Sequence, residues 1–131
     1  MSYSEANFQT DYNIWKRYNM KMTCAEELKI TKTDKFYLSS IEDHQLLHLN
    51  TVNNGFFQFK IPDLGLQCPF DSFSMYQEPA FLVILWYKPR QPKIFYMIPI
   101  VTIQGLLDDC KKSITEEMAA KLAAVTGELK S

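Results

Sequence analysis

The chain has 131 residues, of which 47% are hydrophobic and 14% are aromatic. This apolar content excludes intrinsic disorder, and we expect one domain over residues 1–131 with a packed core. The formal net charge is −1, from 14 basic and 15 acidic side chains. That balance argues against a protein that coats DNA, but it leaves room for a local cationic patch.

The sequence gives no sign of a membrane protein or a secreted one. It has no run of about 18 apolar residues, which a transmembrane helix would need. Its N-terminus lacks the basic and then apolar pattern of a signal peptide. The three cysteines, Cys24, Cys68 and Cys110, are widely spaced and form no CxxC pair, so a zinc finger is not supported. We therefore expect reduced thiols, a cytoplasmic location and no membrane partner.

The first half of the chain predicts two helices and two strands. Ser4 and Ser40 are the expected N-caps, and Asp43 stands in a capping-box position relative to Ser40. Asn19 and Gly55 are the expected helix ends. The elements in chain order are a helix over residues 4–18, a strand over 22–32, a helix from 40 to 54 and a strand over 56–61.

The second half of the chain predicts three strands and then helical structure. Short links join the strands, which indicates a meander or hairpins. Ser113 and Glu116 form an expected capping box for the last helix. The elements are strands over 70–75, 80–88 and 94–98, a helical turn within 101–109 and a helix over 116–125. This order predicts an α/β fold with a mixed central β-sheet flanked by helices.

The sharpest local motif is Glu27-Leu28-Lys29 on the first predicted strand. Residues two apart on a strand share a face, so Glu27 and Lys29 project together while Leu28 faces the other side. A carboxylate can hold Mg²⁺, and a lysine can orient or deprotonate water or steady phosphate charge. The simplest alternative is an exposed strand face that carries a salt bridge.

A longer pattern surrounds this motif. After Glu27-Leu28-Lys29 the chain continues with Phe36-Tyr37-Leu38-Ser39 and then His44-Gln45-Leu46. The pattern resembles the PD-(D/E)xK nucleases of the restriction-endonuclease-like superfamily, in particular RecU-type and phage-encoded Holliday-junction resolvases. In those proteins a Glu-x-Lys strand leads through a loop to a helix with a His-Gln pair. The likeness is clearest over residues 24–49, is looser over 55–98, and covers a little over half of the chain.

The resemblance implies a set of site residues and a metal. The implied cofactor is Mg²⁺, with Mn²⁺ as a substitute. The implied metal ligands are Glu27, the Leu28 carbonyl and Asp71, and Lys29 is the implied catalytic lysine. The implied catalytic site also includes Gln45, at the start of the second helix, and Glu5, the acidic residue that many resolvases place on the first helix. In most relatives the aspartate precedes the Glu-x-Lys strand. Here Asp71 follows it, so its strand would have to lie beside that of Glu27.

The implied function is a Mg²⁺-dependent DNA endonuclease of phage type that resolves branched DNA such as four-way junctions. Such an enzyme would work as a homodimer in the host cytoplasm, because a junction has two-fold symmetry. Four basic residues would contact DNA phosphates: Lys16, Arg17, Lys32 and Lys35. One alternative is a catalytically inactive module of the same fold that binds DNA or a host protein, and another is an interaction protein with no site. Carboxylates of Glu27 and Asp71 within reach of one metal would favour the enzyme.

Three other patterns have a simpler interpretation. His44 and His48 are four apart on a helix, but no third ligand is evident. Pairing Asp71 with Lys88 fails the Glu-x-Lys pattern because residue 86 is Trp. Three basic clusters are most simply solvated surface: Lys16, Arg17 and Lys21; Lys29, Lys32 and Lys35; and Lys88, Arg90 and Lys93.

Overall fold

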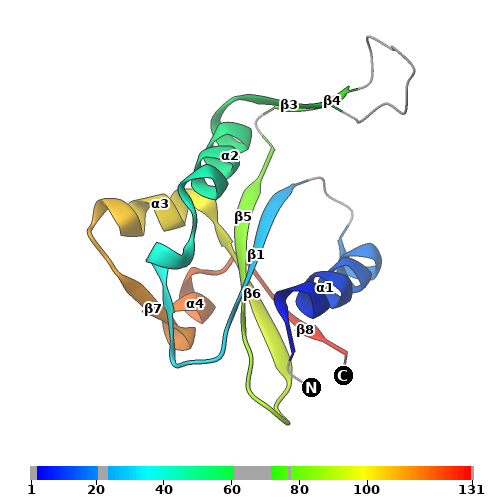
Figure 1. Cartoon of the computed structure of the whole chain (residues 1–131), viewed down its shortest axis with the longest axis vertical. Coiled ribbons are helices and arrows are strands. Elements are labelled where there is room, and N and C mark those ends of the chain that lie inside the picture. Colours follow the sequence, from blue (N-terminus) through cyan, green and yellow to red (C-terminus); the bar gives the residue numbers. More distant parts are fainter. Residues whose placement is uncertain (1–2, 21–23, 61–71, 77, 131) are drawn as a thin grey trace.

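A computed structural model describes residues 3–20, 24–60, 72–76 and 78–130, without the side chains of 56–60 and 72–76 (Figure 1). The helical elements in these residues are α1 (Glu5–Asn19), the 3₁₀ turn η1 (Leu38–Ser40), α2 (Asp43–Asn54), α3 (Ile100–Asp108) and α4 (Glu116–Leu122). The strands are β1 (Ala25–Thr31), β2 (Lys35–Tyr37), β3 (Phe56–Lys60), β4 (Ser72–Tyr76), β5 (Ala80–Trp86), β6 (Lys93–Pro99), β7 (Ser113–Thr115) and β8 (Val125–Leu129).

The main sheet has the order β1-β5-β6-β8. β1 runs parallel to β5, whereas β6 runs antiparallel to both β5 and β8. Helix α1 lies on one face of this sheet, and α2, α3 and α4 lie on the other side (Figure 1). Two small ribbons, β2 with β7 and β3 with β4, complete the described part of the chain. The predicted α/β architecture, a mixed sheet flanked by helices, is confirmed.

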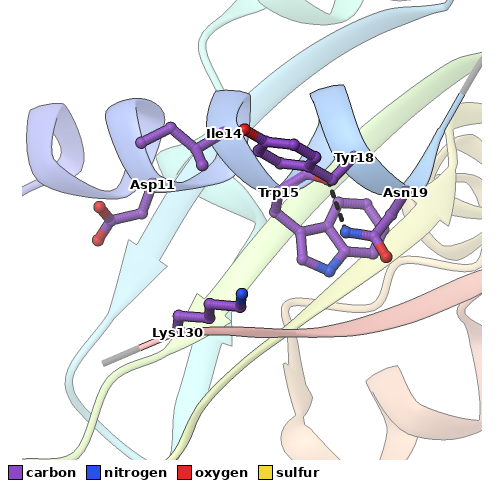
Figure 2. Close-up of a pocket in the computed structure, with 6 residues that line it drawn as sticks. All are labelled: Asp11, Ile14, Trp15, Tyr18, Asn19 and Lys130. Atoms are coloured by element: carbon purple, nitrogen blue, oxygen red, sulfur yellow. Dashed lines mark hydrogen bonds between the residues drawn. The ribbon is translucent and has the colours of Figure 1, made fainter.

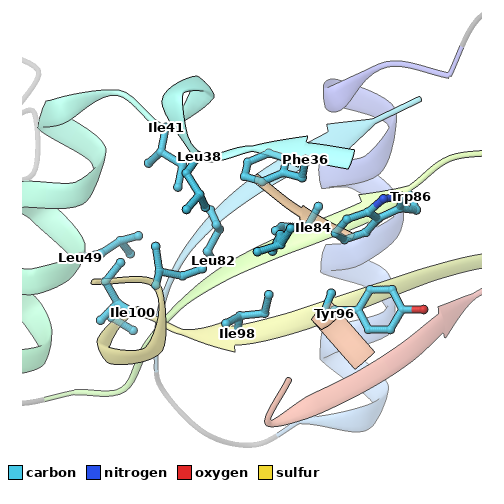
Figure 3. Close-up of a cluster of buried hydrophobic side chains, with 14 residues drawn as sticks. Phe36, Leu38, Ile41, Leu49, Leu82, Ile84, Trp86, Tyr96, Ile98 and Ile100 are labelled. Carbon is cyan, nitrogen blue, oxygen red and sulfur yellow. The ribbon is translucent and has the colours of Figure 1, made fainter. Parts of the chain in front are cut away.

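The core explains why the sheet has helices on both faces. All seven residues of β5 are apolar and buried. A continuous apolar run is typical of a strand whose two faces are both covered. Leu82, Ile84 and Trp86 point to the side of α2, α3 and α4 (Figure 3). Phe81, Val83 and Leu85 alternate with them and pack under α1, together with Phe8, Tyr12 and Phe95.

The two faces of strand β1 pack against different parts of the core. Leu28 and Ile30 pack against the core under α1, whereas Ala25 packs against the core on the α2 side. The alternation of a strand then directs Glu27 and Lys29 to the α2 side. In the register with β5, Glu27 lies opposite Leu82 and Lys29 opposite Ile84. The predicted common face of Glu27 and Lys29 is confirmed.

The helix starts are partly as expected. Ser4 caps α1, because its hydroxyl accepts a hydrogen bond from the Asn7 backbone N–H at 3.2 Å. The predicted cap at Ser40 is wrong. Ser40 ends η1, and its hydroxyl donates to the Tyr37 carbonyl at 2.7 Å. The buried Ile41 then adopts an extended backbone, so α2 begins only at Asp43.

The C-terminal part departs further from the prediction. Ser113 lies in β7 rather than at a helix cap, and Thr115 caps α4 by accepting from the Met118 N–H at 3.3 Å. Helix α4 ends at Leu122, and Val125, expected to be helical, begins β8. The three-residue strands β2 and β7 were missed, because their pairing depends on residues far apart in the chain.

The predicted meander is half right. β5 and β6 form a hairpin, with Ile84 opposite Tyr96. β4 does not join it but pairs with β3, with Gln58 opposite Ser74. Residues 70 and 71, the predicted start of that strand, lie outside the described residues. No helix in the described residues is long and apolar enough to span a bilayer.

Candidate functional site

The carboxylate of Glu27 is held by the first turn of α2. Gln45 Nε2 donates to Glu27 Oε1 at 2.7 Å. The other end of the same amide is also fixed, because Gln45 Oε1 accepts from the Glu42 backbone N–H at 3.0 Å as part of the capping box of α2. The cap that starts the helix therefore also orients the carboxylate, and the positive end of the helix dipole lies beside it.

Burial dominates the electrostatics of Glu27 and raises the pKa of its carboxyl above the ordinary value. Lys29 opposes this shift, whereas Glu5 adds to it, so both charges lie close enough to act on Glu27. His44 lowers the pKa and Glu42 raises it, each by less. Of the predicted site residues, Gln45 on α2 contacts Glu27 directly, whereas Lys29 on β1 and Glu5 on α1 act on its pKa through their charges.

The backbone of β1 adds an oxygen to this group. The Ala25 N–H donates to the Pro79 carbonyl at 2.9 Å, and the Thr31 carbonyl accepts from the Tyr87 N–H at 2.8 Å. In a parallel ladder, alternate residues of a strand direct both their N–H and C=O groups to the same neighbour. Every second residue from Ala25 to Thr31 therefore bonds to β5. Among the described strands β1 has only β5 beside it, so the Leu28 carbonyl points to the free edge.

The other predicted metal ligand and the histidine pair add nothing to this group within the described residues. Asp71 lies outside the described residues. Within the described residues no group of three or more His, Cys, Asp or Glu side chains could hold a metal ion. The His44 and His48 rings lie edge to face at 6.0 Å, and His44 Nδ1 lies 3.2 Å from Glu42 Oε2 on the exposed surface of α2. This histidine pair is therefore part of a helix surface.

A second polar cluster lies on the opposite face of β1, under α1. Glu26 accepts a hydrogen bond from the buried Tyr12 hydroxyl, and Lys16 Nζ lies 2.5 Å from Glu26 Oε1. Burial, aided by Glu26, raises the pKa of the Cys24 thiol to about 11. Only Glu27, not Glu26, faces the α2 side. Lys16, expected to contact DNA, forms an ion pair with Glu26. Sequence reasoning missed this pair because it joins two elements.

A groove in the described chain lies apart from Glu27. It has a volume of about 400 Å³ between α1 and the end of β8 (Figure 2). Trp15 forms its floor and packs edge to face on Phe95 at 4.8 Å. No residue near Glu27 contributes to this groove, whose lining is Asp11, Ile14, Trp15, Tyr18, Asn19 and Lys130.

Comparison with protein-family models, with curated proteins and with solved structures gives no match to this chain. Glu27 is a partly buried carboxylate that an oriented amide holds, and Lys29 lies on the same face of its strand, so this position is the candidate site.

Proposed function

We propose that the chain is a Mg²⁺-dependent DNA endonuclease of the restriction-endonuclease-like superfamily, with its site at Glu27. One observation carries the proposal: Glu27 and Lys29 share the face of β1 on which Gln45 donates to the Glu27 carboxylate at 2.7 Å. The charge of Glu5 on α1 also acts on this carboxyl. These are the residues that the resemblance to PD-(D/E)xK nucleases implies.

The donor atoms near Glu27 suit Mg²⁺, which prefers oxygen ligands. Glu27 and the outward Leu28 carbonyl would hold it, with Asp71 as the proposed further ligand. When bound, the metal would supply charge stabilisation and lower the pKa of a coordinated water. Gln45 orients the Glu27 carboxylate. The Lys29 ammonium, on the same face, would orient the attacking water or offset the charge of the phosphate.

The proposed substrate is branched DNA, in line with the resolvase-like pattern of residues 24–49. A four-way junction presents two equivalent strands, so two copies of the chain related by a two-fold axis would cut it symmetrically. The proposed setting is the cytoplasm of a host cell, as for a phage-encoded protein.

A second candidate is a module of the same fold that binds DNA or a host protein without cutting. The observation in its favour is that the described residues contain no group of three side chains able to hold a metal. The two candidates differ in whether Asp71 completes the site.

Cleavage of labelled DNA tests the proposal. A four-way junction and a matched linear duplex are incubated with the protein in Mg²⁺ or in EDTA. We expect metal-dependent cleavage that prefers the junction and falls about 100-fold or more in Glu27→Gln and Lys29→Gln, since each removes a group that acts on the reacting phosphate. Asp71→Asn should have the same effect, and Glu128→Gln, an exposed control on β8, should have none.

Two results would contradict the enzyme. Cleavage that persists in Glu27→Gln would come from another site or a contaminant. Binding without any cleavage in Mg²⁺ or Mn²⁺ would replace the nuclease by the binding module.

A further inference from the structure

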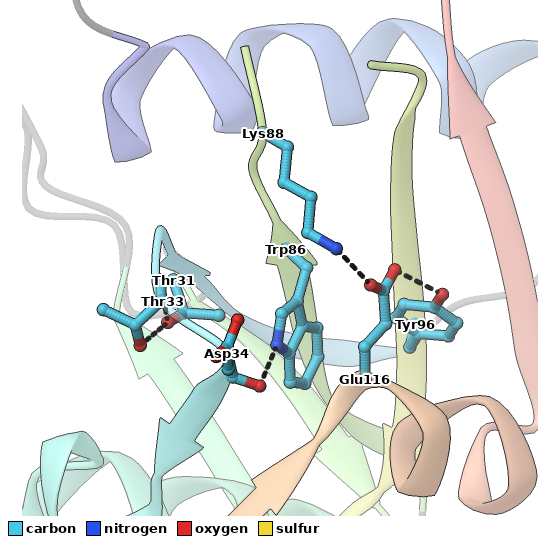
Figure 4. A network of polar contacts seen from close by, with 7 residues as sticks. All are labelled: Thr31, Thr33, Asp34, Trp86, Lys88, Tyr96 and Glu116. Carbon is cyan, nitrogen blue, oxygen red and sulfur yellow. Dashed lines mark hydrogen bonds and ion pairs between the residues drawn. The ribbon is translucent and has the colours of Figure 1, made fainter.

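Two loops that are far apart in the sequence meet at one end of the main sheet. The Thr31 carbonyl accepts from the Tyr87 N–H at 2.8 Å, and Trp86 Nε1 donates to the Asp34 carbonyl at 3.3 Å. Figure 4 shows this contact between the chain after β1 and the end of β5. The connection from β1 to β2 and the turn from β5 to β6 therefore form one surface.

This meeting unites two basic clusters that the sequence presents separately. We call the resulting surface the basic end of the sheet, and its members are Lys32, Lys35, Lys88, Arg90 and Lys93. Lys88 alone of these forms an ion pair with a described carboxylate, Glu116, at 3.4 Å. That carboxylate is also held by the Tyr96 hydroxyl at 2.8 Å (Figure 4). Asp34 is the acidic side chain within the two loops, so the surface carries an excess of positive charge.

Two of the cations are positioned by aromatic rings. Tyr3 and Tyr87 stack with centroids 5.1 Å apart and planes 9° from parallel. Lys93 Nζ lies 4.8 Å from the centroid of Tyr3, and Lys32 Nζ lies 5.7 Å from that of Tyr87. Since the rings face one another, each ammonium covers an outer face. These contacts connect Tyr3 with the ends of β1 and β5 and the start of β6, and they restrict the conformations of both lysine side chains.

The tip of the turn presents a third cation. Arg90 is exposed and adopts a left-handed backbone with φ of 63°, in the sequence Lys88-Pro89-Arg90-Gln91-Pro92. A non-glycine residue in this region carries strain of roughly 1–2 kcal/mol. The flanking prolines stiffen the turn, so the guanidinium projects from a defined position.

We propose that the basic end of the sheet binds the phosphate backbone of nucleic acid. Arg and Lys side chains on loops that follow a rigid sheet are the usual means of holding phosphates. An anionic membrane is a poorer fit, because interfacial binding also needs apolar side chains that insert. The large hydrophobic residues that are exposed in the described chain lie outside both loops: Ile14, Tyr18, Tyr37, Leu47 and Val101.

The position of the basic end relative to Glu27 is consistent with one ligand reaching both. Lys32 follows Glu27 by five residues along β1 and the start of its connection. At about 3.3 Å per residue this is about 16 Å, the length of roughly five base pairs. A duplex along the edge of β1 would have to reach both faces of the strand, because Glu27 faces α2 whereas Lys32 lies over Tyr87 on the α1 side. The basic end adds a binding surface to the proposed function, but binding there does not require cleavage.

The test is equilibrium binding of a fluorescent 20-base-pair duplex in EDTA, where metal-dependent cleavage is silent. The variant is the double substitution Lys35→Gln and Arg90→Asn, since asparagine tolerates the left-handed backbone. The matched control, Lys111→Gln with Lys112→Gln, removes the same charge from the exposed connection between α3 and β7. We expect affinity at 0.1 M salt to fall at least tenfold in the variant, and the salt slope to fall by about two, because two phosphate contacts are lost.

The control should keep the affinity and the salt slope of the parent chain, and circular dichroism should show all proteins folded. An equal loss in the control would mean a general charge effect and would overturn the proposal. So would an unchanged salt slope in the variant, or stronger binding to phosphatidylserine vesicles than to the duplex. Glu128→Gln, exposed on β8, should bind the duplex like the parent. Binding in EDTA reports on the basic end and cleavage in Mg²⁺ reports on the Glu27 site, so failure of one and failure of the other are distinguishable.

Discussion

At the scale of single residues, Glu27 combines a burial penalty with an oriented hydrogen bond. Its folded-state pKa is raised above the ordinary value of a glutamate, mainly by burial. The native state therefore favours the protonated form relative to the unfolded chain. Above the folded pKa, where both states are ionised, this burial lowers stability, and stability recovers as the pH falls through the folded pKa. A residue kept at such a penalty fits a role other than stabilising the fold.

The variant Glu27→Gln should therefore melt at a higher temperature than the parent at pH 7. The neutral amide avoids the burial penalty and its oxygen can still accept the hydrogen bond from Gln45. The gain should shrink as the pH falls through the folded pKa of the parent carboxyl, because that carboxyl then becomes protonated. Thermal unfolding followed by circular dichroism between pH 4 and 7 measures both effects. Glu128→Gln, exposed on β8, is the control, and a lower melting temperature for Glu27→Gln at pH 7 would contradict the prediction.

At the scale of elements, the contact between α1 and β8 depends on a glycine. A Cβ on Gly127 would lie 2.3 Å from Phe95 Cζ and 2.9 Å from Trp15 Cζ2. Phe95 is fully buried, so it has little room to move. We expect Gly127→Ala to lower the free energy of unfolding by about 1–3 kcal/mol, because the core becomes overpacked.

The same substitution at Gly105 provides a control of opposite sign. No atom lies within 4 Å of a Cβ added there, on the exposed side of α3. Gly105→Ala should raise the free energy of unfolding by roughly 0.5–1 kcal/mol, since alanine favours the helix. Urea denaturation at 25 °C compares both variants with the parent. Equal effects of the two substitutions would rule out the contact with Phe95 as the cause.

Elements with a strong local signal could be predicted from the sequence, and those made by distant pairing could not. Helix α1 has regular aromatic spacing and a Ser4 cap, and β5 has a long apolar run, so both were predicted. The sequence predicts no strand at β8, because its pairing with β6 is not local, and the predicted helix over 116–125 includes only its first residue, Val125. Ser40 is predicted as a cap because Asp43 stands three residues on, but the capping box that starts α2 joins Glu42 and Gln45.

At the scale of the whole molecule, strand β5 is the most protected part of the sheet. It pairs with β1 on one side and β6 on the other, and all seven of its residues are buried. We expect its amides to exchange with solvent only through global unfolding, and those of the three-residue strands β2 and β7 to exchange faster through local opening. Hydrogen exchange with urea dependence measures this. Amides of β2 or β7 that exchange as slowly as those of β5 would contradict it.

The candidate site shows the same division between local and distant information. The common face of Glu27 and Lys29 follows from strand alternation, so it could be predicted. The basic end of the sheet could not, because its two halves join only through the hydrogen bonds between Thr31 and Tyr87 and between Asp34 and Trp86. The ion pair of Lys16 with Glu26 was hidden for the same reason.

The parallel pairing of β1 with β5 has a consequence for how the protein is made. Ala25 pairs with Ala80, roughly 55 residues later in the chain, so this contact closes a long loop. On the ribosome, Glu27 emerges well before the strand that gives it a neighbour. The carboxylate, its lysine and the basic end of the sheet are assembled together only after β5 has been released, so a shortened nascent chain carries the motif but not the site.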